Sequence, residues 1–393
     1  MRKDWEYKKL GECFHYIKNG ANIKQVKGAG GYPITRIETL SGGVFNRNRM
    51  GYADVYDIEK YQDYILENGD LLLSHINSKS YIGRTVEYRS RNTEIIIHGM
   101  NLLRIKNNSD VISSSFFAYY ANSHKFKSDI ARIRKDAVNQ SSLSITDLKK
   151  IHVPLPPKPT QLAIVAELDK INELIQLKKQ QLEDYDQLAQ SIFYEMFGDP
   201  VENEKGWEVK KLREIALEKM SYGSGASAVP YNQKIRYIRI TDIDELGCLK
   251  KDIVSPNICE DKYLLSDGDI LFARSGATVG KTFLFKSTYG SCIYAGYLIR
   301  LRPNTQIVIP EYVYHYTKTH YYRSFIESNQ RVVAQPNINA QQYSSLKLPL
   351  PPLPLQQQFA ARIEAIERQK QQVSETIKDL ETLLASRMQY WFD

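Results

Sequence analysis

The sequence predicts a mixed α/β protein in which two similar globular domains alternate with two long helices, as the product of an internal duplication. The first observation is an internal repeat. The segment "PLPPKPTQLAIVAELDKI" from Pro154 has a similar counterpart, "PLPPLPLQQQFAARIEAI" from Pro349, which begins 349 − 154 = 195 residues later. The second is that "WEYKKLGE" at Trp5 returns as "WEVKKLRE" at Trp207. The third is a helical apolar pattern after each proline segment. A chain of 393 residues is also long enough for two or three domains.

Each globular part is predicted to contain many short strands. "NGDLLLSHINSKSYIGRT" from Asn68 matches "DGDILFARSGATVGKT" from Asp267, and "NLLRIK" from Asn101 matches "YLIRLR" from Tyr297. These segments are rich in β-branched and other apolar residues and are bounded by turn residues, which is typical of strands. We expect a short helix at each "WEYKKLGE"-type opening, and further short helices over residues 115–123 and 311–319.

The two proline segments are followed by apolar residues that step by four and three, as in a coiled coil. The first stripe comprises Ile164, Leu168, Ile171, Ile175, Lys178, Leu182, Tyr185, Ala189, Ile192 and Met196. Adding 195 gives the second, Phe359, Ile363, Ile366, Lys370, Val373, Ile377, Leu380, Leu384, Arg387 and Trp391. One such stripe alone also fits a helix packed on its own domain. Two matched stripes favour an antiparallel pair of helices.

The prolines are predicted to mark rigid entries to these helices, because proline cannot continue a helix, and Thr160 is a predicted N-cap. This interpretation divides the chain into a first globular domain (1–153), a first connector helix (154–198), a second globular domain (199–348) and a second connector helix (349–393). The residues expected in the coiled coil are Leu168, Ile171, Ile175, Leu182, Ile366, Val373, Ile377 and Leu380.

The net positive charge comes from the two globular parts alone. The net charge is +8, with 24 Lys+Arg against 16 Asp+Glu in residues 1–150 and 20 against 15 in 201–348. The connectors carry 4 against 8 (151–200) and 5 against 6 (349–393). Basic domains joined by neutral or acidic connectors are expected where the domains bind a polyanion such as DNA. A solvated basic surface explains the same numbers.

Several other classes of protein do not fit the sequence. No apolar run is long enough to span a bilayer, and the charged start "MRKDWEYKKLGECF" lacks the apolar region of a secretory signal. Four cysteines without a CxxC pair fit a reducing cytoplasm and no metal site. "GATVGKT" from Gly276 has three residues between its glycines where a P-loop has four, so we interpret it as a turn. The Gly-Asp pairs at 69–70 and 268–269 are interpreted as tight turns before strands, in preference to nuclease carboxylates.

The ordered double set of motifs resembles the specificity subunit of Type I restriction-modification systems. It includes "PLPP" with a following Gln, a helix ending "FYEMFGDP", "WEVKKLRE", "GDILFARSG" and a second "PLPP" helix, so the resemblance spans the whole chain. It implies a non-catalytic, cytoplasmic subunit without cofactor or metal. Each globular domain would read one half of a bipartite, asymmetric site in double-stranded DNA. The helices would set the spacing, and the residues expected in the coiled coil would also dock two methyltransferase subunits. Restriction subunits would join this core.

Candidate DNA-binding residues come from three loop segments that occur in both copies. Glycine-rich loops that could approach a duplex closely supply Asn22, Lys24, Tyr222 and Ser224. Polar connections between predicted strands supply Asn77, Lys79, Arg84, Arg274, Ser275 and Lys281. The stretches that close each domain supply Arg134 and Arg331. For each segment, an ordinary loop or surface charge is the competing interpretation.

Two other functions stay open at this point. One is a solitary restriction enzyme with an unrecognised active site, although none of the catalytic motifs that we sought is present. The other is a coiled-coil scaffold whose basic domains bind a different acidic partner. DNA binding through several phosphates weakens steeply with salt, which separates it from the scaffold.

Overall fold

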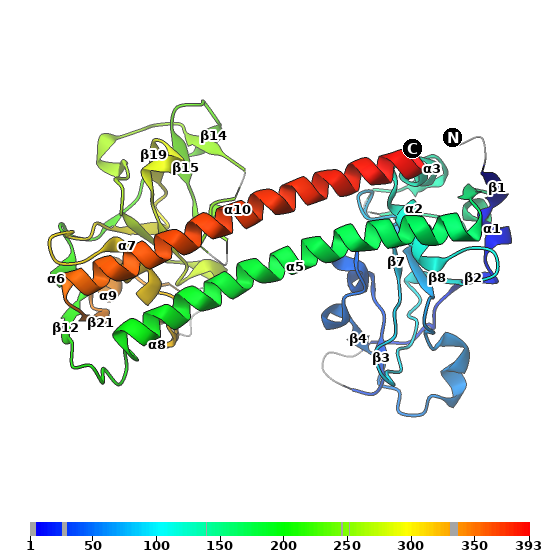
Figure 1. Ribbon diagram of the computed structural model, residues 1–393, viewed down its shortest axis with the longest axis horizontal. Coiled ribbons are helices and arrows are strands. Elements are labelled where there is room, and N and C mark those ends of the chain that lie inside the picture. Colours follow the sequence, from blue (N-terminus) through cyan, green and yellow to red (C-terminus); the bar gives the residue numbers. More distant parts are fainter. Residues whose placement is uncertain (1–4, 26–29, 139, 245–246, 251, 331–336) are drawn as a thin grey trace. The chain divides into compact units, whose positions relative to one another are not determined.

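The computed structural model describes residues 5–25, 30–138, 140–244, 247–250, 252–330 and 337–393 (Figure 1). The chain divides into two compact units. Unit 1 comprises residues 1–178 and 376–393, and unit 2 comprises residues 179–375. Each unit mixes strands with helices and includes part of both long helices, so the predicted mixed α/β class is confirmed.

Each unit is built around a four-stranded antiparallel sheet with the same strand order. In unit 1 the order is β2 (Tyr16–Asn19), β8 (Leu102–Lys106), β5 (Leu71–Ser74) and β7 (Thr85–Glu87). In unit 2 it is β13 (Ser221–Tyr222), β20 (Leu298–Leu301), β17 (Ile270–Ala273) and β18 (Thr282–Leu284). These strands are the repeated segments of the sequence, so the sheet topology confirms the internal duplication.

The two units also have matching sets of helices. Unit 1 has α1 (Leu10–Cys13), α2 (Ser114–Asn122), α3 (His124–Ile133) and α4 (Ile145–Leu148). Unit 2 has α6 (Leu212–Ile215), α7 (Pro310–Tyr316), α8 (His320–Asn329) and α9 (Ala340–Ser344). The predicted helices over 115–123 and 311–319 correspond to α2 and α7, whereas α3 and α8 were not predicted.

Short strands and 3-10 turns complete each unit. In unit 1 they are β3 (Pro33–Ile34), β4 (Gly51–Tyr52), β6 (Ile76–Asn77), β9 (Lys135–Asp136), β10 (Ser141–Ser142), η1 (Ile37–Gly43), η2 (Arg47–Arg49) and η3 (Glu59–Tyr64). In unit 2 they are β14 (Ala228–Pro230), β15 (Arg236–Ile238), β16 (Val254–Pro256), β19 (Cys292–Tyr294), η4 (Ile240–Asp242), η5 (Asp261–Tyr263), η6 (Gly276–Thr278) and η7 (Ser287–Tyr289).

Each opening segment begins with a strand that was not predicted, and the short helix predicted near it is the single turn that follows. β1 (Glu6–Lys9) pairs antiparallel with β11 (His152–Leu155), and β12 (Glu208–Lys211) pairs with β21 (Lys347–Leu350) in the same way. Only one helical turn follows each strand. The pairing closes each globular part, because its first and last strands lie side by side.

Two long helices begin within the proline segments. α5 spans Lys158–Phe197 and α10 spans Leu353–Phe392 (Figure 1). The prediction that Thr160 caps the first helix was wrong, because α5 already begins at Lys158. Pro159 and Pro354 therefore lie in the first helical turn, where the missing N–H costs no helical hydrogen bond.

The predicted stripes face inward along both long helices. All positions of both stripes are buried or half-buried. Of the residues predicted for the coiled coil and for docking, Leu168, Ile171, Ile175, Ile366, Val373 and Ile377 are buried, and Leu182 and Leu380 are half-buried. In unit 2 the Lys370 amine lies 2.8 Å from Asp186, and Arg362 lies 3.8 Å from Glu195. Residue numbers rise along α5 as they fall along α10, so the two segments in this unit run antiparallel.

A buried glutamine fixes the start of each long helix to its own unit. Gln161 Oε1 accepts the N–H of Ser113 at 2.8 Å, and its Nε2 donates to the carbonyls of Val111 (3.3 Å) and Pro156 (3.0 Å). The side chain is 1% exposed. These contacts join the first turn of α5 to the residues that precede α2.

Gln356 repeats this clamp in unit 2. Its Oε1 accepts the N–H of Ile309 at 2.9 Å, and its Nε2 donates to the carbonyls of Ile307 (3.5 Å) and Pro351 (2.7 Å). The offset of 356 − 161 = 195 equals that of the proline segments. The glutamine after each "PLPP" is therefore a structural residue.

Replacing either glutamine by alanine is expected to cost about 2–3 kcal/mol, because a buried N–H and two buried carbonyls lose their partner. Urea unfolding followed by tryptophan fluorescence measures this cost. Trp207 is in unit 2, and Trp5 and Trp391 are in unit 1, so each unit can be followed after the tryptophans of the other are replaced by Phe. Equal costs for Gln161→Ala and Gln356→Ala support the shared role, and a cost below 0.5 kcal/mol contradicts it.

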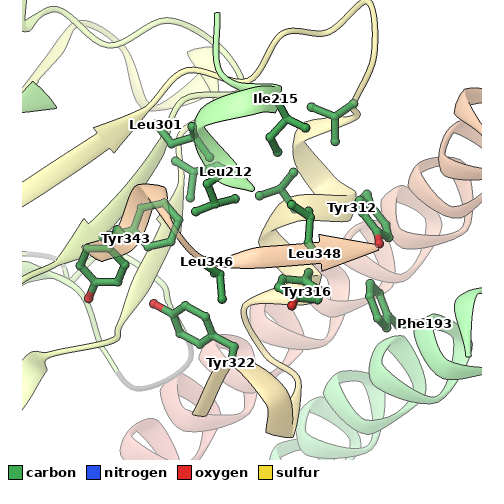
Figure 2. Packing of buried hydrophobic residues seen from close by; sticks show 14 of the residues in the cluster. Phe193, Leu212, Ile215, Leu301, Tyr312, Tyr316, Tyr322, Tyr343, Leu346 and Leu348 are labelled. Carbon is green, nitrogen blue, oxygen red and sulfur yellow. The ribbon is translucent and has the colours of Figure 1, made fainter. Parts of the chain in front are cut away.

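Aromatic residues fill the core of unit 2, where the first long helix contributes Phe193 (Figure 2). Its ring stacks on Tyr312 at 5.5 Å, and it packs edge-on against Phe197 and Phe359 at 5.1 and 5.7 Å. The unit 1 core likewise includes Ile164 and Leu168 of α5. The long helices are thus part of the unit cores. Within the described residues, no helix combines the length and apolarity needed to cross a membrane.

Candidate nucleic-acid interface

Two segments that were predicted to contact DNA converge in unit 2 with a third, unpredicted segment at the start of α9. The guanidinium of Arg274 lies over the ring of Tyr222, 4.8 Å from its centroid, and Arg274 Nε donates to Asn337 Oδ1 at 3.2 Å. The Tyr222 hydroxyl accepts the N–H of Ala340 at 3.1 Å. These residues come from β13, from the end of β17 and from the segment before α9. We call Tyr222, Arg274 and Asn337 the arginine cluster.

The other candidates in unit 2 have different surroundings. Ser275 forms a β-bridge with Asn337 beside the arginine cluster. Ser224 is 5% exposed, and its hydroxyl accepts the N–H of Ala226 at 3.1 Å, so it stabilises its own turn. Lys281 is half-buried in the wall of a cavity. Arg331 lies outside the described residues.

In unit 1 the corresponding segments also converge, but around a carboxylate. Asp136 lies 3.0 Å from the amine of Lys79 and 3.2 Å from the guanidinium of Arg134, and it accepts the Ser141 hydroxyl at 2.6 Å. Ser141 in turn pairs with Asn77 between β10 and β6. The hydroxyl of Ser141 and the amine of Lys79 hold the pKa of Asp136 below its usual value. An exposed ion pair contributes little, so a phosphate could displace this carboxylate at small cost.

The remaining unit 1 candidates lie apart from that group in the contacts described. Arg84 donates to the carbonyl of Leu40 at 3.2 Å and lies 4.6 Å from the ring centroid of Tyr81. Asn22 and Lys24 are exposed, and Asn22 lines a cavity of about 290 Å³. Arg36 contributes a basic side chain to the wall of that cavity.

The structure adds two residues that the sequence did not suggest, Asn337 and His75. His75 occupies in unit 1 the position that Arg274 occupies in unit 2, because His75 directly follows β5 and Arg274 directly follows the matching strand β17. The carbonyl of His75 accepts the N–H of Leu143 at 2.9 Å, and that of Arg274 accepts the N–H of Ile338 at 2.9 Å. Aligning the strands "LLLSH" and "ILFAR" would have revealed this equivalence.

The two Gly-Asp pairs are structural, as predicted. The carboxylates of Asp70 and Asp269 accept the N–H three residues earlier in the chain, at 2.7 and 2.8 Å. Arg104 lies 2.6 Å from Asp70, and Arg302 lies 2.8 Å from Asp269. Burial raises the pKa of Asp70, against the opposing effects of the Glu67 N–H and Arg104. Each aspartate therefore closes a turn and neutralises a cation inside the unit.

The P-loop-like segment "GATVGKT" is a turn, as predicted. It joins β17 to β18, which pair antiparallel, whereas a P-loop leads from a strand into a helix. Gly280 has a φ of +86°, and a Cβ there would lie 3.0 Å from Ile326. The glycine thus serves close packing on α8.

A cavity of about 1220 Å³ lies within unit 2. Its walls include Asp186 and Lys370 of the long helices, Lys281, and Tyr314 and Lys318 near the end of α7. Burial lowers the pKa of Lys318 to about 8. Within the described part of the chain, no group of three or more His, Cys, Asp and Glu is arranged to hold a metal ion.

The comparisons with known proteins agree in one family. The profile of the family described as "Type I restriction modification DNA specificity domain" matches residues 2–184 and 204–382. The MjaX type I restriction enzyme specificity subunit of Methanocaldococcus jannaschii is 30% identical, over 97% of this chain and 93% of that protein. The MjaVIII specificity subunit of the same organism is 22% identical, over 97% and 92%.

Solved structures share the fold. The S subunit of a Type I restriction-modification system from M. genitalium has a TM-score of 0.55 at 15% identity, over 98% of this chain and 95% of that one. A chain from a study of assembly and conformational transition of the type I R-M system has a TM-score of 0.56 at 16% identity, over 100% and 98%. With two matched domains covering most of its length, the chain belongs to the type I restriction-modification DNA specificity family.

Proposed function

We propose that each unit reads one half of a bipartite, asymmetric site in double-stranded DNA, and that the chain itself catalyses no reaction. The observation that carries this proposal is a repeated scaffold with different side chains at its loops. Both units share one sheet order and one glutamine clamp, yet the position after the matched strand is His75 in one and Arg274 in the other. Two units with the same backbone scaffold but different side chains at the loops suit a DNA site whose two halves differ in sequence.

The proposed partners are two methyltransferase subunits, with restriction subunits joining the complex in the cytoplasm. The recognition domains would have the limits predicted above, and the long helices would set the spacing. The apolar stripes are buried in the chain itself, so we expect docking to use the outer faces of the helices. Leu188 and Leu383 support this expectation, since they are 46% and 45% exposed at equivalent positions (383 − 188 = 195).

The test is to purify the chain with and without its neighbouring methyltransferase subunit and to map methylated positions on DNA by single-molecule sequencing. A gapped two-part motif that requires both proteins is the expected result. Methylation or cleavage by this chain alone would reveal an active site. The absence of modification with the methyltransferase would favour the scaffold.

Salt dependence provides an independent check. Log affinity for DNA should fall linearly with log salt concentration, because each phosphate contact releases counterions. A preference for the mapped motif should persist as total affinity falls. Binding that is insensitive to salt contradicts recognition through basic domains.

A further inference from the structure

The arginine cluster of unit 2 holds one side chain in a fixed orientation at the surface. Arg274 is half-buried, its Nε donates to Asn337, and its guanidinium carbon lies over the ring of Tyr222. The hydrogen bond from the N–H of Ala340 to the Tyr222 hydroxyl fixes the ring in turn. The hydrogen bond and the ring contact therefore restrict both the position and the rotation of the Arg274 guanidinium before any ligand binds.

Among the described residues, these contacts leave the terminal nitrogens of Arg274 available. Only Nε has a hydrogen-bond partner among the described residues. Two terminal nitrogens in a plane form a fork of parallel N–H donors, which matches a pair of acceptors on one ligand edge. In the major groove, guanine presents such a pair, O6 and N7.

Unit 1 presents no comparable donor at the equivalent position. His75 is 7% exposed, and burial lowers the pKa of its imidazole, so the ring is neutral and enclosed. Its backbone is nevertheless held as that of Arg274 is, through the carbonyl bond to Leu143. The same place in the scaffold is therefore filled by a buried histidine in unit 1 and by a half-buried arginine in unit 2.

We propose that Arg274 reads a guanine in the half-site of unit 2, and that Asn337 and Tyr222 are positioning residues for this contact. The inference rests on the proposed function and refines it. A phosphate could accept the same fork, but a phosphate contact does not require the guanidinium to be fixed in rotation. The hydrogen bond at Nε and the contact with the Tyr222 ring already restrict the arginine side chain. The side chain therefore loses less entropy when it binds one base edge.

The experiment maps methylation motifs for the wild-type chain, Arg274→Ala and Arg274→Lys, each combined with the methyltransferase subunit. Both variants should relax one position of one half-site from guanine towards any base, with discrimination at that position falling about 10- to 100-fold. All other positions should keep their preference. Asn337→Ala, at an exposed side chain, should relax the same position to a smaller extent.

The control is Arg213→Ala, which removes the same charge from an exposed position on α6 of the same unit. It should leave the motif unchanged. Uniformly weaker methylation with an unaltered motif, restored by Arg274→Lys, would identify a phosphate contact and overturn the proposal. If the wild-type chain gives no gapped motif, the proposed function itself fails. An unchanged motif and rate in both Arg274 variants, beside a gapped wild-type motif, defeats only the guanine contact.

Discussion

Replacing Asp269 by asparagine is expected to lower the free energy of unfolding of unit 2 by about 3 kcal/mol. The carboxylate is buried and receives two hydrogen bonds from Arg302, at 2.8 and 2.9 Å. An amide has one oxygen and cannot accept this fork, so the arginine loses its main partner. The cost lies at the low end for a broken buried pair, because Arg302 also lies 3.2 Å from Glu218.

The measurement is urea unfolding in a Trp5→Phe/Trp391→Phe background, where Trp207 alone reports on unit 2. Its indole donates to the carbonyl of Phe197 at 3.0 Å, so its fluorescence depends on the folded unit. Asp261→Asn is the control, because that side chain is exposed in the same unit and should change stability by less than about 0.5 kcal/mol. A loss below 1 kcal/mol for Asp269→Asn means that the Gly-Asp turn has little structural role.

Replacing Phe193 by alanine is expected to destabilise unit 2 by about 3–5 kcal/mol. The side chain is 1% exposed and packs on Tyr312, Phe197 and Phe359. Its removal leaves a cavity among aromatic rings that are held by their own helices. The long helix would then be less firmly attached to the unit.

The same fluorescence assay measures this loss. Leu188→Ala is the matched control on the same helix, since Leu188 is 46% exposed and its truncation leaves no cavity. Unit 1, followed separately in a Trp207→Phe background, should keep its stability. A loss for Phe193→Ala no larger than that for Leu188→Ala would show that this part of α5 is not part of the unit 2 core.

The long helices could be predicted because their apolar periodicity is sustained over 40 residues, which tertiary context seldom overrides. The duplicated sheet could be predicted because its strands coincide with the repeated segments. The opening strands were missed because β1 and β12 find their partners about 145 residues later, at Pro154 and Pro349, and local pattern does not record such pairing. Proline at these positions also argued against a strand.

The candidate interface was only partly predictable. Loops could be chosen from composition: Arg274 was chosen from a polar loop between predicted strands, and Tyr222 from a glycine-rich loop. Their contact could not be foreseen, because it depends on segments 52 residues apart (274 − 222) that the sheet brings together. Ser224 was chosen for its type, yet its hydroxyl is bound within its own turn.

The central claim is that each unit reads its own half of one DNA site. Its most direct test is to replace residues 1–150 by the same segment of a relative with a different motif, and to map methylation with the original methyltransferase subunit. The account predicts that one half of the gapped motif changes while the other half is retained. A change in both halves, or in neither, would contradict it.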